Sequence, residues 1–271
     1  MIKQAIIPLA GLGTRLLPLT SVFAKELLPI NGKPGLEYII EECVEAGIEE
    51  IIFIISKKKE MIKKYFYNDK FYKDIIKKKK DLRIINEYKK ILNYRKKIKF
   101  VYQNKPQGTG DAVLKTKKFI KDKYFLMLLP DDLITKRNCS MSMIKSHKIH
   151  KASVMATMPV KKKDVSRWGI FNLDTRLNKT DYLIREVVEK PNIKNAPSNK
   201  AVIGRYILPK SIFSKLSKMK AGKGGEIHIT DAIQSLINEN EKFIAHNFLG
   251  KYLDCGTLKG YINSSKEISR L

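Results

Sequence analysis

Residues 9–15 read Leu9-Ala10-Gly11-Leu12-Gly13-Thr14-Arg15, a glycine loop that is followed ten positions later by a second motif, Lys25-Glu26-Leu27-Leu28-Pro29. The apolar run at residues 4–10 has the length of a strand and two β-branched residues at its centre, so we predict a buried strand that leads into the loop. The two glycines allow a ligand to approach the backbone, and the threonine and arginine after them supply a hydroxyl group and a fixed cationic fork. This chemistry favours a polyphosphate ligand.

Two common phosphate-binding loops are excluded by the residues after the second glycine. A dinucleotide-binding loop needs a third glycine three residues further on, where Leu16 stands, and a P-loop ends in Gly-Lys-Ser or Gly-Lys-Thr, which does not follow here. With the glycines alone, an ordinary turn between a strand and a helix is the alternative interpretation. Arg15 and the Lys25-Glu26 pair favour the phosphate loop.

The composition is that of a globular protein. The chain has 271 residues, 43% of them hydrophobic, which is enough for one large α/β domain or two small ones. The longest apolar runs, residues 51–55 and 124–129, are far shorter than a membrane span, and no signal-peptide pattern opens the chain. We therefore predict a cytoplasmic protein that contacts no membrane. Cys43, Cys139 and Cys255 lack the spacing of a zinc site or a disulfide framework, so we expect reduced thiols.

A formal charge of +27 raises the question of nucleic-acid binding, because Lys and Arg neutralise phosphate backbones. Only nine of the 54 basic residues are Arg. The lysines cluster in residues 57–59, 77–80 and 161–163, which we expect to be solvated, and they lack the arginine and glycine pattern of RNA-binding modules. We predict no nucleic-acid partner, and a basic nucleic-acid-binding protein is kept as the alternative from a different class.

Strand and helix patterns alternate along the first half of the chain. Apolar residues at spacings of three and four predict an amphipathic helix over 35–46, which Gly47 ends, and a buried strand follows at 51–55. This order implies a parallel crossover, with ligands at the carboxyl ends of the strands. Residues 57–97 are rich in Lys and Tyr, with helical patches at 61–66 and 71–76, and we interpret them as an insertion of surface helices. Further strands are predicted at these positions: 98–102, 124–129, 152–158, 168–171, 183–188 and 201–208.

A second glycine loop runs from Gln103 to Val113 and contains Gly108 and Gly110. The Gln103 amide can pair with the edge of a nucleotide base. This loop would be weak evidence by itself, since glycines are common in turns. It gains weight from the first loop.

Acidic residues follow two of the predicted strands. Asp131 and Asp132 end the strand at 124–129, and Asp254 precedes a glycine turn. Mg²⁺ prefers such hard oxygen ligands and takes one or two carboxylates together with substrate phosphates. An aspartate that caps the next turn is the alternative. By contrast, His147 and His150 have helical spacing but no third ligand, and we expect no metal there.

Glu189-Lys190-Pro191 closes the strand at 183–188. A carboxylate can accept hydrogen bonds from sugar hydroxyls, and a neighbouring ammonium can hold a phosphate. A surface ion pair at a strand end is the alternative interpretation.

With these motifs together, the sequence resembles the bacterial UTP-glucose-1-phosphate uridylyltransferases, a branch of the sugar-phosphate nucleotidyltransferases. The resemblance covers nearly the whole chain, and the following segments carry it: residues 10–15, 25–29, 32–34, 108–113, 129–131, 189–191, 196–199, 204–206, 224–227, 230–233, Asp254 and Gly256. Ala196-Pro197-Ser198-Asn199 and Gly224-Gly225-Glu226-Ile227 point to the uridylyltransferase branch.

The resemblance implies an α/β, Rossmann-like nucleotidyltransferase fold, with a mixed, mostly parallel central sheet flanked by helices. It implies one domain over residues 1–271, with the insertion at about 57–97, and a homo-oligomer, either a dimer or a tetramer. The implied reaction joins UTP and α-D-glucose 1-phosphate, with Mg²⁺ as cofactor, and yields UDP-glucose and pyrophosphate by in-line attack on the α-phosphorus. A sister enzyme that uses dTTP, CTP or another sugar phosphate is the near alternative.

The resemblance also implies a role for particular residues. The nucleotide would be bound by Ala10, Gly11, Gly13, Thr14, Gln103 and Gly108. The catalytic cations would be Arg15, Lys25 and Lys190, and the sugar phosphate would contact Gly169, Glu189 and Lys190. The metal would be held by Asp131 and Asp254.

The sequence departs from the family pattern at three positions. Ala24 precedes Lys25 where the family usually has proline, Ser21 stands where lysine is common, and Asp111 stands where we expect histidine. The alanine makes the approach to Lys25 less rigid than in the family, and the departures at Ser21 and Asp111 concern the nucleotide contacts.

Overall fold

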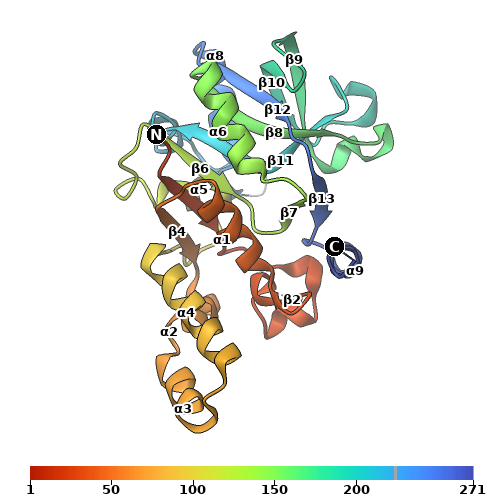
Figure 1. The fold of residues 1–271 in the computed structure, drawn as a ribbon. Coiled ribbons are helices and arrows are strands. Elements are labelled where there is room, and N and C mark those ends of the chain that lie inside the picture. Colours follow the sequence, from red (N-terminus) through yellow and green to blue (C-terminus); the bar gives the residue numbers. More distant parts are fainter. Residues whose placement is uncertain (223–224, 271) are drawn as a thin grey trace.

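A nine-stranded mixed sheet forms the centre of this computed structural model, which describes residues 1–222 and 225–270 (Figure 1). Its strands are β1 (Gln4–Pro8), β4 (Glu50–Ile55), β5 (Ile98–Tyr102), β6 (Tyr124–Leu128), β8 (Ser153–Pro159), β9 (Gly169–Arg176), β10 (Asp181–Glu189), β11 (Lys200–Pro209) and β12 (Phe243–Asn247). They lie in the order β5-β4-β1-β6-β11-β8-β12-β10-β9. Two small sheets pair β2 (Pro29–Ile30) with β3 (Lys33–Pro34) and β7 (Asp132–Thr135) with β13 (Lys251–Asp254).

The four strands β5, β4, β1 and β6 run parallel to one another. The first glycine loop, the loop that starts at Gln103 and the turn that starts at Leu129 therefore leave the sheet at the same edge. Loops at this edge of a parallel sheet are the usual ligand-binding positions of α/β folds.

The second half of the sheet is mostly antiparallel. β11 lies antiparallel between β6 and β8, β12 runs parallel to β8, and β10 pairs antiparallel with β12 and β9. Between Ile203 and Tyr206 the pairing of β11 with β8 shifts register, which marks an irregularity at Gly204 and Arg205. The predicted α/β class with a mixed sheet is confirmed.

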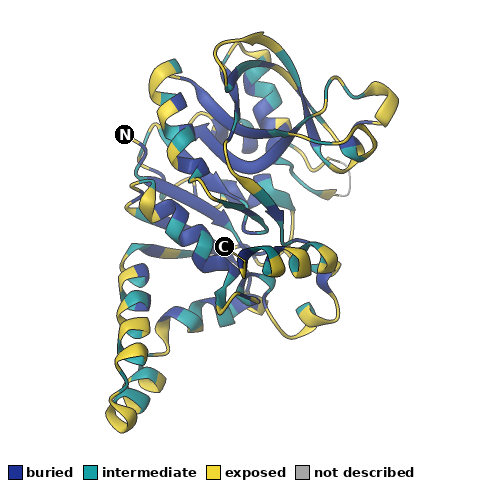
Figure 2. Cartoon of the chain, turned by 45° about the vertical axis from the view of Figure 1, so that its right-hand side comes forward, coloured by how far each residue is buried: buried dark blue, intermediate teal, exposed yellow. Residues whose placement is uncertain are grey.

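Helices cover both faces of the sheet, because successive residues of a strand point to opposite sides. The described helices are α1 (Gly35–Glu45), α2 (Glu60–Tyr67), α3 (Asp69–Lys79), α4 (Leu82–Lys97), α5 (Gly108–Leu114), α6 (Cys139–His150), α7 (Ile212–Leu216), α8 (Ile229–Asn238) and α9 (Leu258–Ile268). On one face Ile7 and Phe53 belong to the core cluster that contains the apolar side of α1. On the other face Ile6 and Ile52 belong to the cluster that contains α5, α7 and α8. The sheet between these layers is largely buried (Figure 2).

Helices α2, α3 and α4 form an arm that extends away from the sheet (Figure 1). The base of the arm is part of the core through Ile62, Phe66 and Ile91, whereas α3 has no buried residue. The predicted helical patches lie within α2 and α3. α4 was not predicted as a helix, although its residues Ile84, Tyr88, Ile91 and Leu92 have helical spacing.

No helix within residues 1–222 and 225–270 has the length and apolar character that a membrane span requires.

Candidate active site

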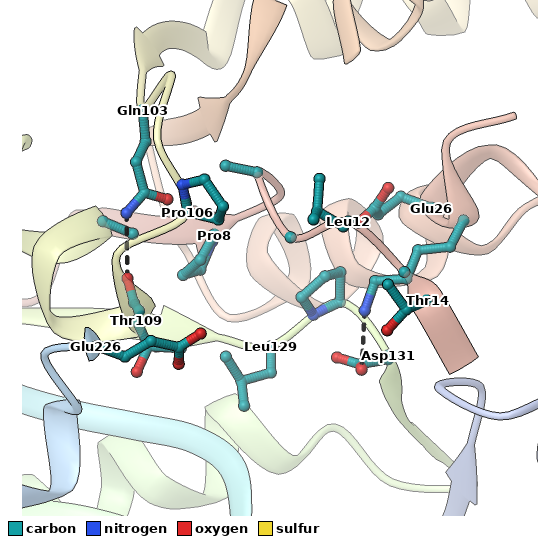
Figure 3. Close-up of a pocket in the computed structure, with 17 residues that line it drawn as sticks. Pro8, Leu12, Thr14, Glu26, Gln103, Pro106, Thr109, Leu129, Asp131 and Glu226 are labelled. Atoms are coloured by element: carbon teal, nitrogen blue, oxygen red, sulfur yellow. Dashed lines mark hydrogen bonds and ion pairs between the residues drawn. The ribbon is translucent and has the colours of Figure 1, made fainter. Parts of the chain in front are cut away.

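The first cleft lies at the carboxyl ends of β1, β5 and β6 and has a volume of about 430 Å³ (Figure 3). All six residues predicted to bind the nucleotide line it: Ala10, Gly11, Gly13, Thr14, Gln103 and Gly108. Pro8, Leu12 and Pro106 add apolar surface suited to the flat face of a base. The structure therefore brings together the two glycine loops that lie about ninety residues apart in the sequence.

Gly108 has a structural role in addition to lining the cleft. Its φ of +94° is a backbone conformation that other residues rarely adopt, and a Cβ atom there would lie 2.5 Å from the carbonyl oxygen of Ile227. The Ile227 N–H donates to Gln107 O at 2.8 Å, and the Gly110 N–H donates to Ile227 O at 2.8 Å. The backbone that approaches this loop most closely is thus that of residue 227, which fixes the shape of the loop.

Lys25 and Arg15 both contact the Asp131 carboxylate at the edge of the first cleft. Lys25 Nζ lies 2.9 Å and Arg15 Nη2 3.3 Å from Asp131 Oδ2. Burial alone would lower the pKa of Lys25, but the negative charges of Asp131 and Glu26 outweigh it and raise the pKa. Burial pushes the pKa of Asp131 up, and the Lys25 ammonium outweighs that effect and lowers it. At neutral pH the pair consists of an ammonium and a carboxylate.

A second cleft of about 220 Å³ lies beside the first, between the β9–β10 hairpin and the turn after β6. Its lining contains the predicted sugar-phosphate residues Gly169 and Glu189, which are cross-strand partners on β9 and β10, and it also contains Arg15. Among the described residues, Leu129 and Asp131 are the ones that line both clefts. Two separate ligands can therefore meet at Asp131.

Lys190 is the predicted site residue that the structure does not place in either lining. Its side chain is 62% exposed and lies beside Glu189, with Nζ 3.4 Å from Oε1. Its backbone N–H donates to the carbonyl oxygen of Trp168, a residue of the second cleft, at 3.0 Å. The Lys190 ammonium therefore lies next to the second cleft, outside its lining.

The two predicted metal ligands meet through the small β7–β13 sheet. Asp254 lies directly opposite Asp132 in its register, and the Cys255 N–H donates to Asp131 O at 2.7 Å. A Cβ atom on Gly256 would lie within 3.2 Å of side-chain atoms of Asp131, Arg15 and Asp254, so these three groups surround one point. No group of three or more His, Cys, Asp or Glu side chains suited to a metal ion occurs in the described part of the chain, residues 1–222 and 225–270. Two carboxylates fit a magnesium ion that takes its other ligands from phosphates and water.

Asp132 also lines the second cleft, although the sequence analysis gave the metal role to Asp131. Its carboxylate accepts hydrogen bonds from the Gly204 N–H at 2.9 Å and from the Tyr252 hydroxyl at 2.7 Å. Burial and the neighbouring Asp131 charge raise the pKa of Asp132 to about 6. The two adjacent aspartates therefore have different partners: Asp131 contacts two cations, whereas Asp132 accepts from a backbone N–H and a hydroxyl group.

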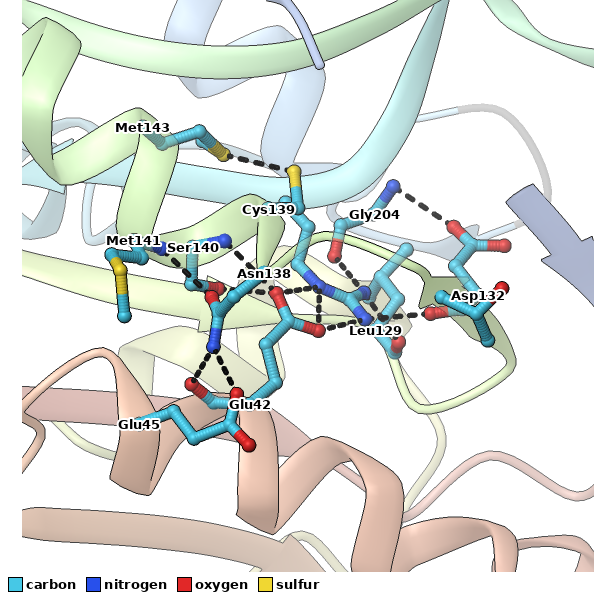
Figure 4. Close-up of polar contacts among 12 residues, drawn as sticks. Glu42, Glu45, Leu129, Asp132, Asn138, Cys139, Ser140, Met141, Met143 and Gly204 are labelled. Atoms are coloured by element: carbon cyan, nitrogen blue, oxygen red, sulfur yellow. Dashed lines mark hydrogen bonds and ion pairs between the residues drawn. The ribbon is translucent and has the colours of Figure 1, made fainter. Parts of the chain in front are cut away.

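Arg205 is buried, and the sequence analysis quoted it only within the segment 204–206 and gave it no role. Figure 4 shows the polar contacts around Glu42, Leu129 and Asp132, to which it belongs. Its guanidinium pairs with Glu42 of α1, with Nη2 2.8 Å from Oε2. It also donates to the carbonyl oxygens of Leu129 at 3.2 Å and Asp132 at 2.7 Å, the two ends of the turn that carries Asp131. Glu42 in turn accepts from the Ser140 N–H and hydroxyl at the start of α6. An isolated arginine in a strand pattern gave no indication of this network.

Lys59 corrects one expectation. The run at residues 57–59 was expected to be solvated, but Lys59 is only 7% exposed and its Nζ lies 2.7 Å from Oε1 of Glu26. Glu26 is itself buried, and a buried carboxylate requires a partner because desolvation of a lone charge is costly. The base of the helical arm is thus joined to the motif that carries Lys25.

His147 and His150 each contact an oxygen acceptor of the protein. His147 Nδ1 lies 2.7 Å from Ala152 O, and His150 Nε2 lies 2.9 Å from Asp181 Oδ2. The cysteines are free: Cys43 and Cys139 are buried and Cys255 is partly exposed.

Comparison with known proteins gives a consistent result. The profile of the nucleotidyl transferase family matches residues 4–270. The UTP–glucose-1-phosphate uridylyltransferase of Bacillus subtilis is 38% identical over 270 residues, which cover 99% of this chain and 91% of that protein. A solved UDP-glucose pyrophosphorylase complexed with UDP-glucose superposes with a TM-score of 0.87 at 36% identity and covers 100% of this chain and 99% of its own. The UTP-bound UGPase from Acinetobacter baumannii has a TM-score of 0.89 at 32% identity, with 99% and 93% covered.

Proposed function

The chain belongs to the nucleotidyl transferase family, and we propose that it joins UTP and α-D-glucose 1-phosphate into UDP-glucose with release of pyrophosphate. The full-length similarity to enzymes of that name supports this assignment. The observation that carries it is the meeting of two clefts at one carboxylate, Asp131, which is contacted by both Lys25 and Arg15.

In the proposed arrangement the first cleft takes UTP and the second takes glucose 1-phosphate. Ala10, Gly11, Gly13 and Thr14 lie along the nucleotide, with Gln103 and Gly108 at the base. Gly169 and Glu189 contact the sugar. Gly169 has no side chain and so leaves room for the ring, and the Glu189 carboxylate accepts hydrogen bonds from the sugar hydroxyls. Lys190 reaches the sugar phosphate from its exposed position next to the second cleft.

The proposed reaction needs little covalent help from the protein. The phosphate of glucose 1-phosphate has its second pKa at about 6, so it is largely a dianion at neutral pH and requires no general base. One of its oxygens forms a bond to the α-phosphorus of UTP while the bond to the bridging oxygen breaks and pyrophosphate leaves. Lys25 and Arg15 offset the negative charge that develops, and the two clefts hold the reactants in line.

Asp131 and Asp254 are the residues that would hold Mg²⁺, which when bound neutralises phosphate charge. Their geometry fits the ion because both carboxylates reach the space next to Gly256. In the structure, Lys25 and Arg15 form ion pairs with the Asp131 carboxylate. When the triphosphate is bound, its oxygens can pair with these cations instead, which leaves the carboxylate available to the ion.

We further propose that residues 1–271 act as one domain, that the protein is cytoplasmic and that it forms a homo-oligomer. The core clusters that run through both halves of the sheet support the single domain.

The experiment that tests the function measures pyrophosphate release by purified protein with Mg²⁺ and glucose 1-phosphate. UTP should react far faster than dTTP, CTP, ATP or GTP, and reactions without glucose 1-phosphate give the hydrolysis background. Faster release with dTTP or CTP would instead identify a sister enzyme. Equal rates for all five nucleotides, or no release above background, would contradict the proposal.

A further inference from the structure

We propose that Asp111 is a positioning residue that makes the first cleft select uracil over cytosine, by fixing the orientation of the Gln103 amide. The inference rests on the proposed function, since it assigns the base of the nucleotide to the part of the cleft at Gln103. Asp111 does not line the cleft and would act through Gln103.

Gln103 is held in place by three hydrogen bonds. Its backbone N–H donates to Ile55 O at 2.9 Å, which extends the pairing of β5 with β4. Its side-chain Nε2 donates to Asp111 Oδ2 at 2.8 Å and to Gly108 O at 3.1 Å. Both protons of the amide NH₂ group therefore have partners, and the side chain is only 5% exposed.

The second amide atom, Oε1, has no hydrogen bond within residues 1–222 and 225–270. Figure 3 shows the nitrogen of this amide on the side of Thr109 and the oxygen on the side of Pro106, which also lines the cleft. Gln103 thus offers an acceptor, and no spare donor, to a base bound beside it.

Asp111 and the Gly108 carbonyl oxygen together decide which way the amide points, and Asp111 is the partner that a side-chain substitution can change. A carboxylate accepts hydrogen bonds and cannot donate them, so rotation of the Gln103 amide by 180° would bring its oxygen against the oxygen of Asp111. Asp111 is itself 5% exposed, and its other oxygen, Oδ1, lies 3.2 Å from Lys115 Nζ. Because Asp111 is buried, the flipped amide would leave buried acceptor oxygens in contact.

An acceptor at this position distinguishes pyrimidine bases. Uracil carries an N3–H donor that Oε1 can accept, whereas cytosine presents an N3 lone pair that would face the oxygen without a proton between them. Thymine has the same N3–H as uracil, so the orientation of Gln103 separates UTP from CTP and leaves the choice between UTP and dTTP to other contacts. The inference thus predicts a selective effect on one of two competing nucleotides.

The test compares Asp111→Asn with the unchanged protein and with Lys115→Met. Asparagine has the same shape but can donate as well as accept, so only the Gly108 carbonyl oxygen still favours the original orientation of the Gln103 amide. Lys115→Met removes the partially exposed partner of Asp111 while the carboxylate stays in place. Dissociation constants for UTP, CTP and dTTP are measured by calorimetry, together with kcat/KM for each nucleotide where turnover occurs.

In Asp111→Asn the preference for UTP over CTP should fall about tenfold or more, while the preference for UTP over dTTP stays within about twofold of the unchanged protein. Lys115→Met should retain both preferences. An unchanged UTP-to-CTP ratio in Asp111→Asn, or an equal loss for all three nucleotides, would overturn the inference, because the latter is what general damage to the fold would produce. Failure of the proposed function can be distinguished from failure of this inference. In the first case the unchanged protein would show no turnover, whereas the ratio of the dissociation constants for UTP and CTP would still report the effect of Asp111.

Discussion

At the scale of single residues, Asp131 is the side chain at which the two clefts and the two cations of the site meet. It lines both clefts and accepts contacts from Lys25 and Arg15, and its turn is held at both ends by Arg205. Because charged groups in a partly dry cleft interact more strongly than in water, removal of a cation here should affect the reaction far more than removal of one elsewhere. Lys25 is the sharper test of this idea, since its side chain is less exposed than that of Arg15.

Lys25→Met should lower kcat for uridylyl transfer by about 10² to 10³, because it removes one cation that offsets charge in the transition state. Steady-state pyrophosphate release measures the effect. Lys58→Met is the matched control, because Lys58 is exposed and lies outside both clefts. A Lys25→Met protein with near-normal kcat would remove Lys25 from the catalytic group.

At the scale of secondary-structure elements, the pair of Arg205 and Glu42 joins β11, α1 and the turn after β6. Both side chains are buried, so when one of them is removed, water cannot take its place as a partner of the other. Breaking such a pair from one side leaves an uncompensated charge, whereas replacing both members by apolar residues is much better tolerated.

Glu42→Leu should reduce the free energy of unfolding by about 3 to 5 kcal/mol, and the double variant Glu42→Leu/Arg205→Met should regain part of this loss. Urea denaturation followed by circular dichroism measures both. Glu45→Ala, an exposed position on the same helix, is the control and should change stability by about 0.5 kcal/mol or less. If the double variant were less stable than Glu42→Leu, the buried charge would not be the cause.

The elements show what sequence patterns can and cannot predict. The helix expected at 35–46 is α1 and the strand expected at 51–55 is β4, because hydrophobic periodicity is a local property of the sequence. The two glycine loops lie in one cleft, because both follow parallel strands and leave the sheet at the same edge. The burial of Lys59 and of Arg205 could not be predicted, because each depends on a carboxylate that is distant in the sequence. Asp111 was recognised only as a departure from a pattern, and its contact with Gln103 required the structure.

At the scale of the whole molecule, Asp181 ties together three elements of the second half of the sheet. Its carboxylate on β10 accepts from His246 on β12, at 2.6 Å from Nδ1, and from Ser146 on α6 at 3.0 Å. Burial would raise the pKa of Asp181, but hydrogen bonds from His246, Asn178 and His150 outweigh it and hold the pKa far below the usual range.

Because the folded pKa of Asp181 lies below the unfolded value of about 4, its contribution to stability is present above about pH 4 and is lost as the pH falls further. Asp181→Asn should therefore cost about 2 to 3 kcal/mol at neutral pH, and the difference from the unchanged protein should shrink toward about pH 3. Urea titrations across this range measure it. Asp174→Asn, at an exposed position on β9, is the control and should change stability at neutral pH by about 0.5 kcal/mol or less. A constant difference for Asp181→Asn across the pH range would contradict the assignment.

The net charge of +27 acts on the molecule as a whole. Like charges repel more in the compact state than in the unfolded chain, so screening should stabilise the fold. The melting temperature should rise by a few degrees when NaCl increases from about 0.01 M to about 0.15 M, as the Debye length falls from about 30 Å to about 8 Å. Differential scanning calorimetry measures the change, with sucrose at equal osmolality as the control. A falling melting temperature would show that attractive ion pairs dominate.

Among the described residues the two clefts share Leu129 and Asp131, and apart from the neighbours Thr14 and Arg15 of the first glycine loop their other lining residues lie mostly on different segments. This separation bears on how such an enzyme diversifies. If the first cleft binds the base and the second the sugar, as proposed, mutations in the loops around Gln103 can alter the choice of base without changing the β9–β10 hairpin, and mutations in the hairpin can alter the choice of sugar without changing those loops. We expect descendants of this architecture to acquire new nucleotide and new sugar preferences independently, with the shared aspartate as the part that neither change can replace.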